Sequence, residues 1–203
     1  MSPGHWRPSD RLMLWIDAVG GYWLCLGDQI TLGRPDPQGT ADVAILGDLG
    51  ARHARVRRDG EGYVVEALRD VRVNDQPVGR LGRLGDGSRI GLGQSVRMLF
   101  RRPHPLSATA RLEFISPHRT QPSSDAVLLM ADACVLGPDA RSHVVCRGWP
   151  CEVVLCRRGT ELFCRAKGQL KIDGLVREGS APIAAGSRVE GEGFSFNLEA
   201  IGA

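Results

Sequence analysis

The stretch from Leu32 to Val56 determines most of what the sequence predicts. It starts with Leu32-Gly33-Arg34 and ends with Gly50-Ala51-Arg52-His53-Ala54-Arg55-Val56, and a polar loop with one short apolar run lies between. Arg34 follows the end of one expected strand, and Arg52 precedes the start of the next. An arginine at a loop tip can bind a phosphate group through charge-assisted, bidentate hydrogen bonds. The stretch therefore predicts one strand that is followed by an arginine and a next strand that is preceded by one.

The rest of the chain favours an all-β fold. Short apolar runs recur between Gly, Pro, Asp and Asn residues, and few segments keep the 3.6-residue period of a helix. Gly20-Gly21, Asp59-Gly60 and Asp86-Gly87 mark turns between these runs. The expected strands are 12–18, 22–31, 54–57, 63–67, 71–73, 88–90 and 95–101. Their close spacing is typical of a β-sandwich or barrel.

The second half repeats this pattern after about 100 residues, which indicates a duplication. The clearest match joins Gly186-Ser187-Arg188-Val189 to Gly87-Ser88-Arg89-Ile90. The other matches are 111–115 with 11–15, 127–137 with 23–33, Ile172-Asp173-Gly174 with Val73-Asn74-Asp75, and Arg141-Ser142-His143-Val144-Val145 with Ala51-Arg52-His53-Ala54-Arg55. We therefore predict two tandem antiparallel β-sandwiches. The first takes residues 9–103, a connector with the first strand of the second repeat takes 104–126, and the second sandwich takes 111–202.

Four segments resemble, in the same order, the forkhead-associated (FHA) family of binding domains. They are Gly33-Arg34, Arg52-His53, Val73-Asn74 and the run from Leu84 to Gly93. The resemblance covers most of residues 20 to 101 and implies an FHA/SMAD-like sandwich that binds phosphothreonine. It implies that Arg34 is the main phosphate ligand and Arg52 a neighbouring one. Gly33 and His53 would organise the binding loops, and Asn74 would hold the loop that follows it.

The sequence departs from the FHA pattern at two peptide-contacting positions. Gly50 stands where the family has a serine, and residues 67–70 leave no counterpart of the usual loop asparagine. Each lost charge-assisted hydrogen bond costs about 1.5–3 kcal/mol of binding free energy. Arg69 or Arg72 could replace these contacts. In the second half Pro138 and Ala140 replace the arginine and the serine, which predicts a second sandwich that does not bind phosphothreonine.

Composition narrows the class of partner. The 203 residues are 42% apolar and 24% charged, as in an ordinary globular protein. The net charge of +3 and the aromatic content of 5% disfavour nucleic acid. No apolar run approaches the roughly 18 residues of a membrane helix, and we expect neither a signal peptide nor a membrane partner. The six cysteines form no Cys-x-x-Cys pair, so we expect a cytoplasmic, reducing compartment.

We therefore expect a protein–protein interaction module and not an enzyme, with no catalytic residue, no metal site and no cofactor. The expected partner is a protein phosphorylated on threonine, either a Ser/Thr kinase or its substrate. The alternative is a phosphate-independent scaffold that presents the surfaces of two rigidly packed sandwiches. The sequence does not predict the oligomeric state.

Three weaker interpretations use other residues. Ser88, His53 and Asp86 are the residue types of a catalytic triad, but no nucleophile-elbow sequence surrounds them. Thr120, in the inter-repeat segment, is a candidate phosphorylated residue for an FHA surface. A zinc site is the third interpretation, but the spacing of the available ligand types matches no common zinc pattern. The ligand types available for it are His143, Cys146, Cys151, Cys156 and Cys164.

Overall fold

The computed structural model describes residues 11–60, 62–104 and 106–201, and within these ranges the chain forms twenty-one β-strands and no helix. The predicted all-β class is confirmed. Accordingly, the described residues contain no helix of the length and apolar character needed to cross a membrane.

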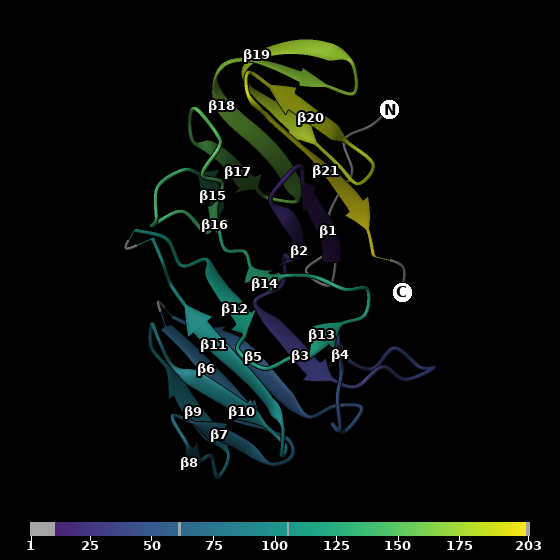
Figure 1. The fold of residues 1–203 in the computed structure, drawn as a ribbon, viewed down its shortest axis with the longest axis vertical. Helices are drawn as coiled ribbons and strands as arrows, with labels where there is room; N and C mark the ends of the chain where they lie inside the picture. Colours follow the sequence, from purple (N-terminus) through teal and green to yellow (C-terminus); the bar gives the residue numbers. More distant parts are fainter. Residues whose placement is uncertain (1–10, 61, 105, 202–203) are drawn as a thin grey trace.

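Two sheets contain these strands (Figure 1). The smaller sheet has the order β13-β4-β3-β5-β6-β9, and the larger follows β16-β15-β17-β18-β20-β21-β1-β2-β14-β12-β11-β10-β7-β8, with β19 paired to β18. Most pairs are antiparallel as predicted, whereas β3–β4, β15–β16 and β2–β14 are parallel. The strands are β1 Arg11–Ile16, β2 Gly20–Cys25, β3 Gln29–Gly33, β4 Val43–Leu46, β5 Ala54–Asp59, β6 Gly62–Ala67, β7 Val71–Val73, β8 Gln76–Pro77, β9 Leu81–Leu84, β10 Arg89–Leu92, β11 Val96–Arg101, β12 Ala110–Phe114, β13 Arg119–Thr120, β14 Ala126–Leu129, β15 Ala133–Gly137, β16 Val144–Val145, β17 Val153–Arg158, β18 Glu161–Ile172, β19 Leu175–Ile183, β20 Arg188–Gly191 and β21 Phe194–Ala200.

The strands enclose two hydrophobic cores, which follow one another along the long axis of the molecule (Figure 1). The first core includes Ile30 and Val65 from the smaller sheet and Phe100 from the larger one. The second core includes Leu155 and Phe196, from strands of the second half. Each half of the chain therefore supplies most of one core.

The first strands of the two halves are exchanged between the cores. β1 pairs with β21, near the C-terminus, and Leu14 lies opposite Leu198. β12, the first strand of the second half, pairs with β11 and places Leu112 opposite Phe100. β2 and β14 pair in parallel between them. The N-terminal hairpin thus closes the second core, and the β12–β14 hairpin closes the first.

Strands β1, β2 and β14 place side chains in both cores, because the two faces of each strand pack on different cores. Leu12 and Leu14 belong to the second core, whereas Met13 and Trp23 belong to the first. Such strands have continuous apolar sequence instead of alternation. The predicted boundaries at 9–103, 104–126 and 111–202 stay predictions, but strand pairing crosses them in both directions. Residues 9–10, 61, 105 and 202 of those spans lie outside the described residues.

The single strand expected over 22–31 is two strands. β2 ends at Cys25 and β3 begins at Gln29 in the other sheet. Residues 26–28 carry the chain between the cores, and residues 130–132 do the same between β14 and β15. The prediction was wrong because apolar residues stand on both sides of the crossing, so hydrophobicity alone shows no break there.

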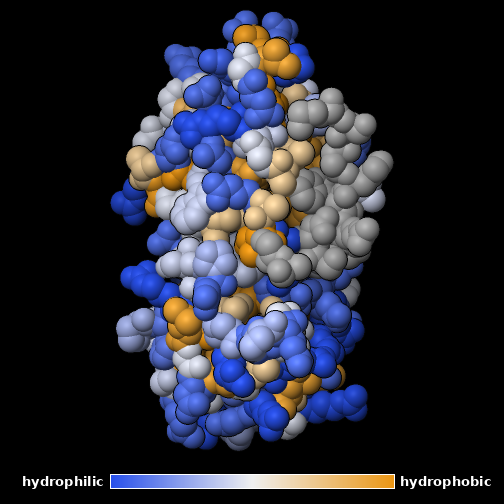
Figure 2. All heavy atoms as spheres, turned by 90° about the vertical axis from the view of Figure 1, so that its right-hand side faces the viewer, coloured by the Kyte–Doolittle hydropathy of each residue, from blue (hydrophilic) through white to orange (hydrophobic). Residues whose placement is uncertain are grey.

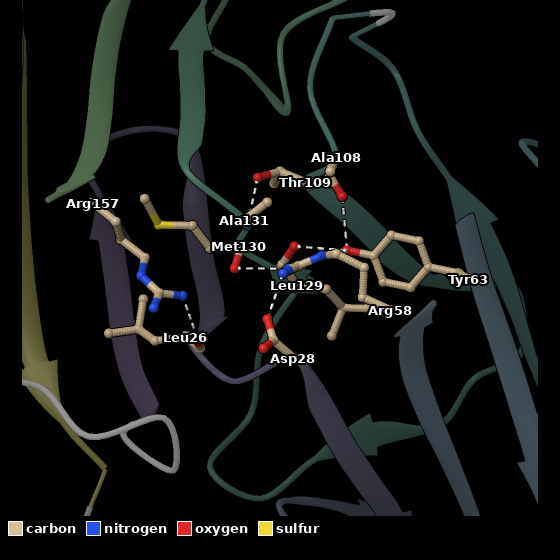
Figure 3. Close-up of polar contacts among 10 residues, drawn as sticks. All are labelled: Leu26, Asp28, Arg58, Tyr63, Ala108, Thr109, Leu129, Met130, Ala131 and Arg157. Atoms are coloured by element: carbon tan, nitrogen blue, oxygen red, sulfur yellow. Dashed lines mark hydrogen bonds and ion pairs between the residues drawn. The ribbon is translucent and has the colours of Figure 1, made fainter. Parts of the chain in front are cut away.

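Two arginines form hydrogen bonds with the crossing segments 26–28 and 130–132 (Figure 3). Arg58 on β5 donates hydrogen bonds to Met130 O at 3.1 Å and to Asp28 Oδ1 at 2.6 Å. Arg157 on β17 donates to Leu26 O at 2.5 Å. Each guanidinium therefore binds a backbone carbonyl of the other half of the chain. Met130 is the first residue after β14, and Leu26 is the first residue after β2. Because hydrogen bonds to charged groups are among the stronger ones, these contacts hold the two halves together.

The two halves repeat the same hydrogen bonds around one turn. Asn74 Oδ1 accepts from Arg89 N at 2.9 Å, and Asp173 Oδ1 accepts from Arg188 N at 2.8 Å. Asn74 and Asp173 both have a φ of 51°, in the left-handed region that Asn and Asp tolerate. The local geometry that the sequence match at these residues implied is therefore present in both halves.

His143 occupies a different place in the repeat from the one expected. β16 runs parallel to β15 as β4 does to β3, so the residue before β16 corresponds to the residue before β4. His143 Nδ1 accepts a hydrogen bond from Val135 N, and Asp42 Oδ2 accepts the corresponding one from Thr31 N. His143 therefore corresponds to Asp42 and not to His53. The predicted match of residues 141–145 with 51–55 was wrong because five residues constrain an alignment less than strand pairing does.

We expect His143 to make stability depend on pH. Its side chain is fully buried, and burial, with the positive charges of His104 and Arg111, lowers its pKa from 6.5 to about 4. The unfolded state therefore binds a proton between these pH values, whereas the folded state does not. The contribution of His143 to the free energy of unfolding should be fully present above pH 6.5. It should fall by about 3 kcal/mol as the pH drops to 4.

Urea unfolding at pH 7, 5.5 and 4.5 measures this dependence. His143→Asn is the matched variant, because asparagine keeps an acceptor for Val135 N and does not titrate. As the pH falls, the free energy of unfolding of wild type should decrease relative to that of His143→Asn. A constant difference across this range would contradict the assignment.

Candidate functional site

Gly33 lies where two loops of the first sandwich come closest. A Cβ atom at this position would lie 2.0 Å from Ala51 O and 2.9 Å from Gly50 O, so only glycine fits. The next residue, Arg34, donates its backbone N–H to Gly50 O at 3.0 Å. The β3–β4 loop is therefore held against the β4–β5 loop, with Arg34 at the junction.

His53 joins the β4–β5 loop to the β6–β7 loop. It is 4% exposed; its Nδ1 accepts a hydrogen bond from Gly50 N at 3.2 Å, and its Nε2 donates to Asp70 O at 2.8 Å. Its backbone carbonyl accepts from Arg69 N at 3.0 Å. This arrangement uses both ring nitrogens of a neutral imidazole and leaves none for a ligand. His53 therefore links the two loops by hydrogen bonds, and its role in a binding site stays a prediction.

Three arginines stand on these joined loops. Arg34, Arg52 and Arg69 are exposed, and none of them forms an ion pair with a described residue. Arg34 Nη1 donates only a 3.3 Å hydrogen bond to Pro35 O. Because a guanidinium offers five donors, these side chains keep most of their hydrogen-bonding capacity for an anion.

The β3–β4 loop has an organiser that the motif comparison missed. The Asp36 carboxylate accepts hydrogen bonds from Gln38 N at 2.9 Å and from Thr40 Oγ1 at 2.7 Å. The Thr40 hydroxyl, with further backbone donors, holds the pKa of Asp36 below its usual range. Asp36 is therefore satisfied within its own loop although Arg34 is near. The Asp-Pro-Gln-Gly turn sequence was the available signal.

Asn74 does not belong to this group of arginines. β7 separates it from the β6–β7 loop, since Arg69 and Asp70 precede that strand and Asn74 follows it. Its side chain holds the β7–β8 turn against Arg89 N. The structure therefore brings together Arg34, Arg52 and Arg69 of the predicted site residues and places Asn74 at the other end of a strand.

The equivalent end of the second half lacks these arginines. Val153 pairs with Leu136 as Ala54 pairs with Leu32. By this register Pro138 corresponds to Arg34, and Cys151 corresponds to Arg52. The second half therefore has no cationic side chain at either of these two positions.

The residues of the weaker interpretations have other roles. Within the described ranges no three His, Cys, Asp or Glu side chains lie where they could share a metal ion. Burial raises the pKa of Cys164 to about 12 and that of Cys146 to about 11, so neither is readily a thiolate ligand. Thr120, expected to be accessible to a kinase, is 1% exposed and is hydrogen-bonded to Ser124 at 2.8 Å. That expectation was wrong because β13 pairs the segment to β4.

The fold and the site define an all-β protein in which three loops of one sandwich present a rim of arginines that have no ion-pair partner in the described part of the chain. No protein-family model and no curated protein matches the chain.

Among solved structures, the chain is similar to an FHA domain described in a structural and functional analysis of phosphothreonine-dependent FHA domain interactions. The identity is 29% over 47% of this chain and 99% of that chain, with a TM-score of 0.35. It is also similar to Mycobacterium tuberculosis EmbR in complex with a low-affinity phosphopeptide, at 23% identity over 45% of this chain and a TM-score of 0.34. That match spans 24% of EmbR. A third is the FHA domain of an Arabidopsis thaliana protein, at 21% identity over 49% of this chain and 91% of that chain, with a TM-score of 0.32.

Proposed function

We propose that the first sandwich is an FHA-type protein interaction module that binds a phosphothreonine-containing segment of a partner through Arg34 and Arg52. The partner is a Ser/Thr kinase or one of its substrates, and binding involves no catalysis. The observation that carries this proposal is the exposed, unpaired arginine rim on loops joined by the Gly33 contact and by His53.

The charges support a phosphate ligand. A phosphothreonine carries nearly two negative charges and three acceptor oxygens. The guanidinium groups of Arg34 and Arg52 can meet these oxygens in bidentate geometry. Of the nearby acidic groups, Asp36 is held by its own loop, and among the described residues Asp70 forms no ion pair with a rim arginine. The rim therefore has cationic groups to offer and a rigid frame beneath them.

A phosphothreonine peptide library tests the proposal on the full chain. Wild type should retain peptides from the phosphorylated library and not from the same library after phosphatase treatment. Arg34→Ala should weaken binding about 10- to 100-fold, because it removes a charge-assisted hydrogen bond. Arg57→Ala is the matched control, since this exposed arginine lies further along β5, away from the rim. Equal retention from both libraries would refute phosphate dependence.

A second candidate is a phosphate-independent scaffold. It is favoured by the continuous sheet that joins the halves and by the crossings that Arg58 and Arg157 fasten. Leu175 and Val176, 58% and 59% exposed, lie at the β18–β19 end, where Figure 2 shows a small apolar patch among hydrophilic side chains. Retention of proteins by wild type and Arg34→Ala alike, unchanged by phosphatase, would support this candidate.

A further inference from the structure

Arg69 lies over the position where the FHA resemblance expects a serine side chain. A Cβ atom built on Gly50 would be 3.5 Å from Arg69 Cγ and 3.6 Å from Arg69 Nε. Gly50 itself is fixed, because its carbonyl accepts from Arg34 N and its N–H donates to His53 Nδ1. The Arg69 side chain therefore occupies the space beside Gly50 that a hydroxymethyl group would share.

The backbone holds Arg69 in this place. Its N–H donates to His53 O at 3.0 Å, and the N–H of Leu68 donates to the same carbonyl at 3.2 Å. The guanidinium is exposed and has no ion-pair partner among the described residues. Arg72, the other arginine near the shortened loop, lies within β7 opposite Gly91 of β10, and its Cβ is directed at that residue. Only Arg69 of the two is set beside Gly50.

We propose that Arg69 replaces the missing hydroxyl as a phosphate ligand, so that guanidinium groups from three different loops hold the anion. This inference rests on the proposed function of the first sandwich. Arg34 comes from the β3–β4 loop, Arg52 from the β4–β5 loop and Arg69 from the β6–β7 loop. A neutral donor is thus exchanged for a cation, which favours a dianionic phosphomonoester. Arg69 then compensates for the missing serine at position 50, and the phosphate site is kept.

A double-mutant cycle tests the coupling on the full chain. The probe is a fluorescent phosphothreonine peptide pool of random flanking sequence, measured by anisotropy. Arg69→Ala should weaken binding about 10- to 100-fold, whereas Arg72→Ala should change it by less than about twofold. Gly50→Ser should have little effect in wild type, because Arg69 already supplies the hydrogen-bond donor that the serine would add and the new Cβ would make ordinary contacts. In the Arg69→Ala background, Gly50→Ser should recover at least about half of the lost binding free energy.

The outcomes separate the inference from the function on which it rests. Strong binding by wild type that Arg69→Ala leaves unchanged would overturn the role of Arg69 and leave the proposed function intact. Equal effects of Gly50→Ser in both backgrounds would also overturn it, since the two positions would then be independent. If wild type binds the pool no better than an unphosphorylated pool, the proposed function fails and the inference fails with it. Circular dichroism of each variant confirms that the fold is kept.

Discussion

Replacing Leu14 by alanine should lower the free energy of unfolding by about 2–5 kcal/mol, and the loss should appear in the second core. Leu14 is fully buried in that core and lies opposite Leu198, although it stands near the start of the chain. A truncated side chain leaves a cavity that neighbouring strands of close-packed sandwiches fill only in part. The exchanged hairpin therefore makes the second half depend on the N-terminal residues.

Urea unfolding gives the total loss, and native-state hydrogen exchange gives its location. In Leu14→Ala, amides of β18, β20 and β21 should lose more protection than amides of β5 and β10. Leu46→Ala is the control, because Leu46 is 52% exposed on β4 and should change stability by less than about 0.5 kcal/mol. Greater loss of protection in β5 and β10 would show that the hairpin belongs to the first core.

Replacing Gly33 by alanine should both destabilise the protein and abolish phosphopeptide binding. The added methyl would lie 2.0 Å from a backbone oxygen, Ala51 O, so the β4–β5 loop must move. Overpacking of this kind costs about 1–3 kcal/mol of unfolding free energy. Moving the loop also breaks the hydrogen bond from Arg34 N to Gly50 O, and with it the spacing of the arginines.

Gly85→Ala is the matched control for this change. A Cβ atom on Gly85 would meet no atom within 4 Å, so stability and affinity should stay near those of wild type. Thermal unfolding and peptide anisotropy measure the two quantities. A Gly33→Ala protein with wild-type affinity would show that the close contact between the loops does not position Arg34.

The sequence predicted the rim better than the architecture around it. Gly33, His53 and the arginines were identified from short motifs, because close approach and loop anchoring require particular residue types at particular places. Asp36 was missed, since its role depends on a turn within a loop that the motif comparison did not cover. The contact between Arg69 and Gly50 was also invisible, because the two residues lie in different loops.

The exchange of first strands had no local signal. β1 carries apolar residues that can face either core, and its sequence matches that of β12 as a repeat unit should. Pairing β1 with β11 or with β21 therefore buries similar side chains. Burial on both faces of the shared strands, together with the Arg58 and Arg157 hydrogen bonds, distinguishes the two arrangements. These are contacts between residues far apart in the chain.

By itself, the sequence determined the all-β class, the repeat of turn residues and the residue types of the arginine rim, because these follow from local periodicity and backbone requirements. Only the tertiary structure decided which hairpin closes which core, that His143 corresponds to Asp42, and that Arg69 lies over Gly50. The physical reason is the same in each case. The local sequence pattern specifies which side chains are buried and which residues form turns. The residues that they contact are determined by packing across the whole molecule.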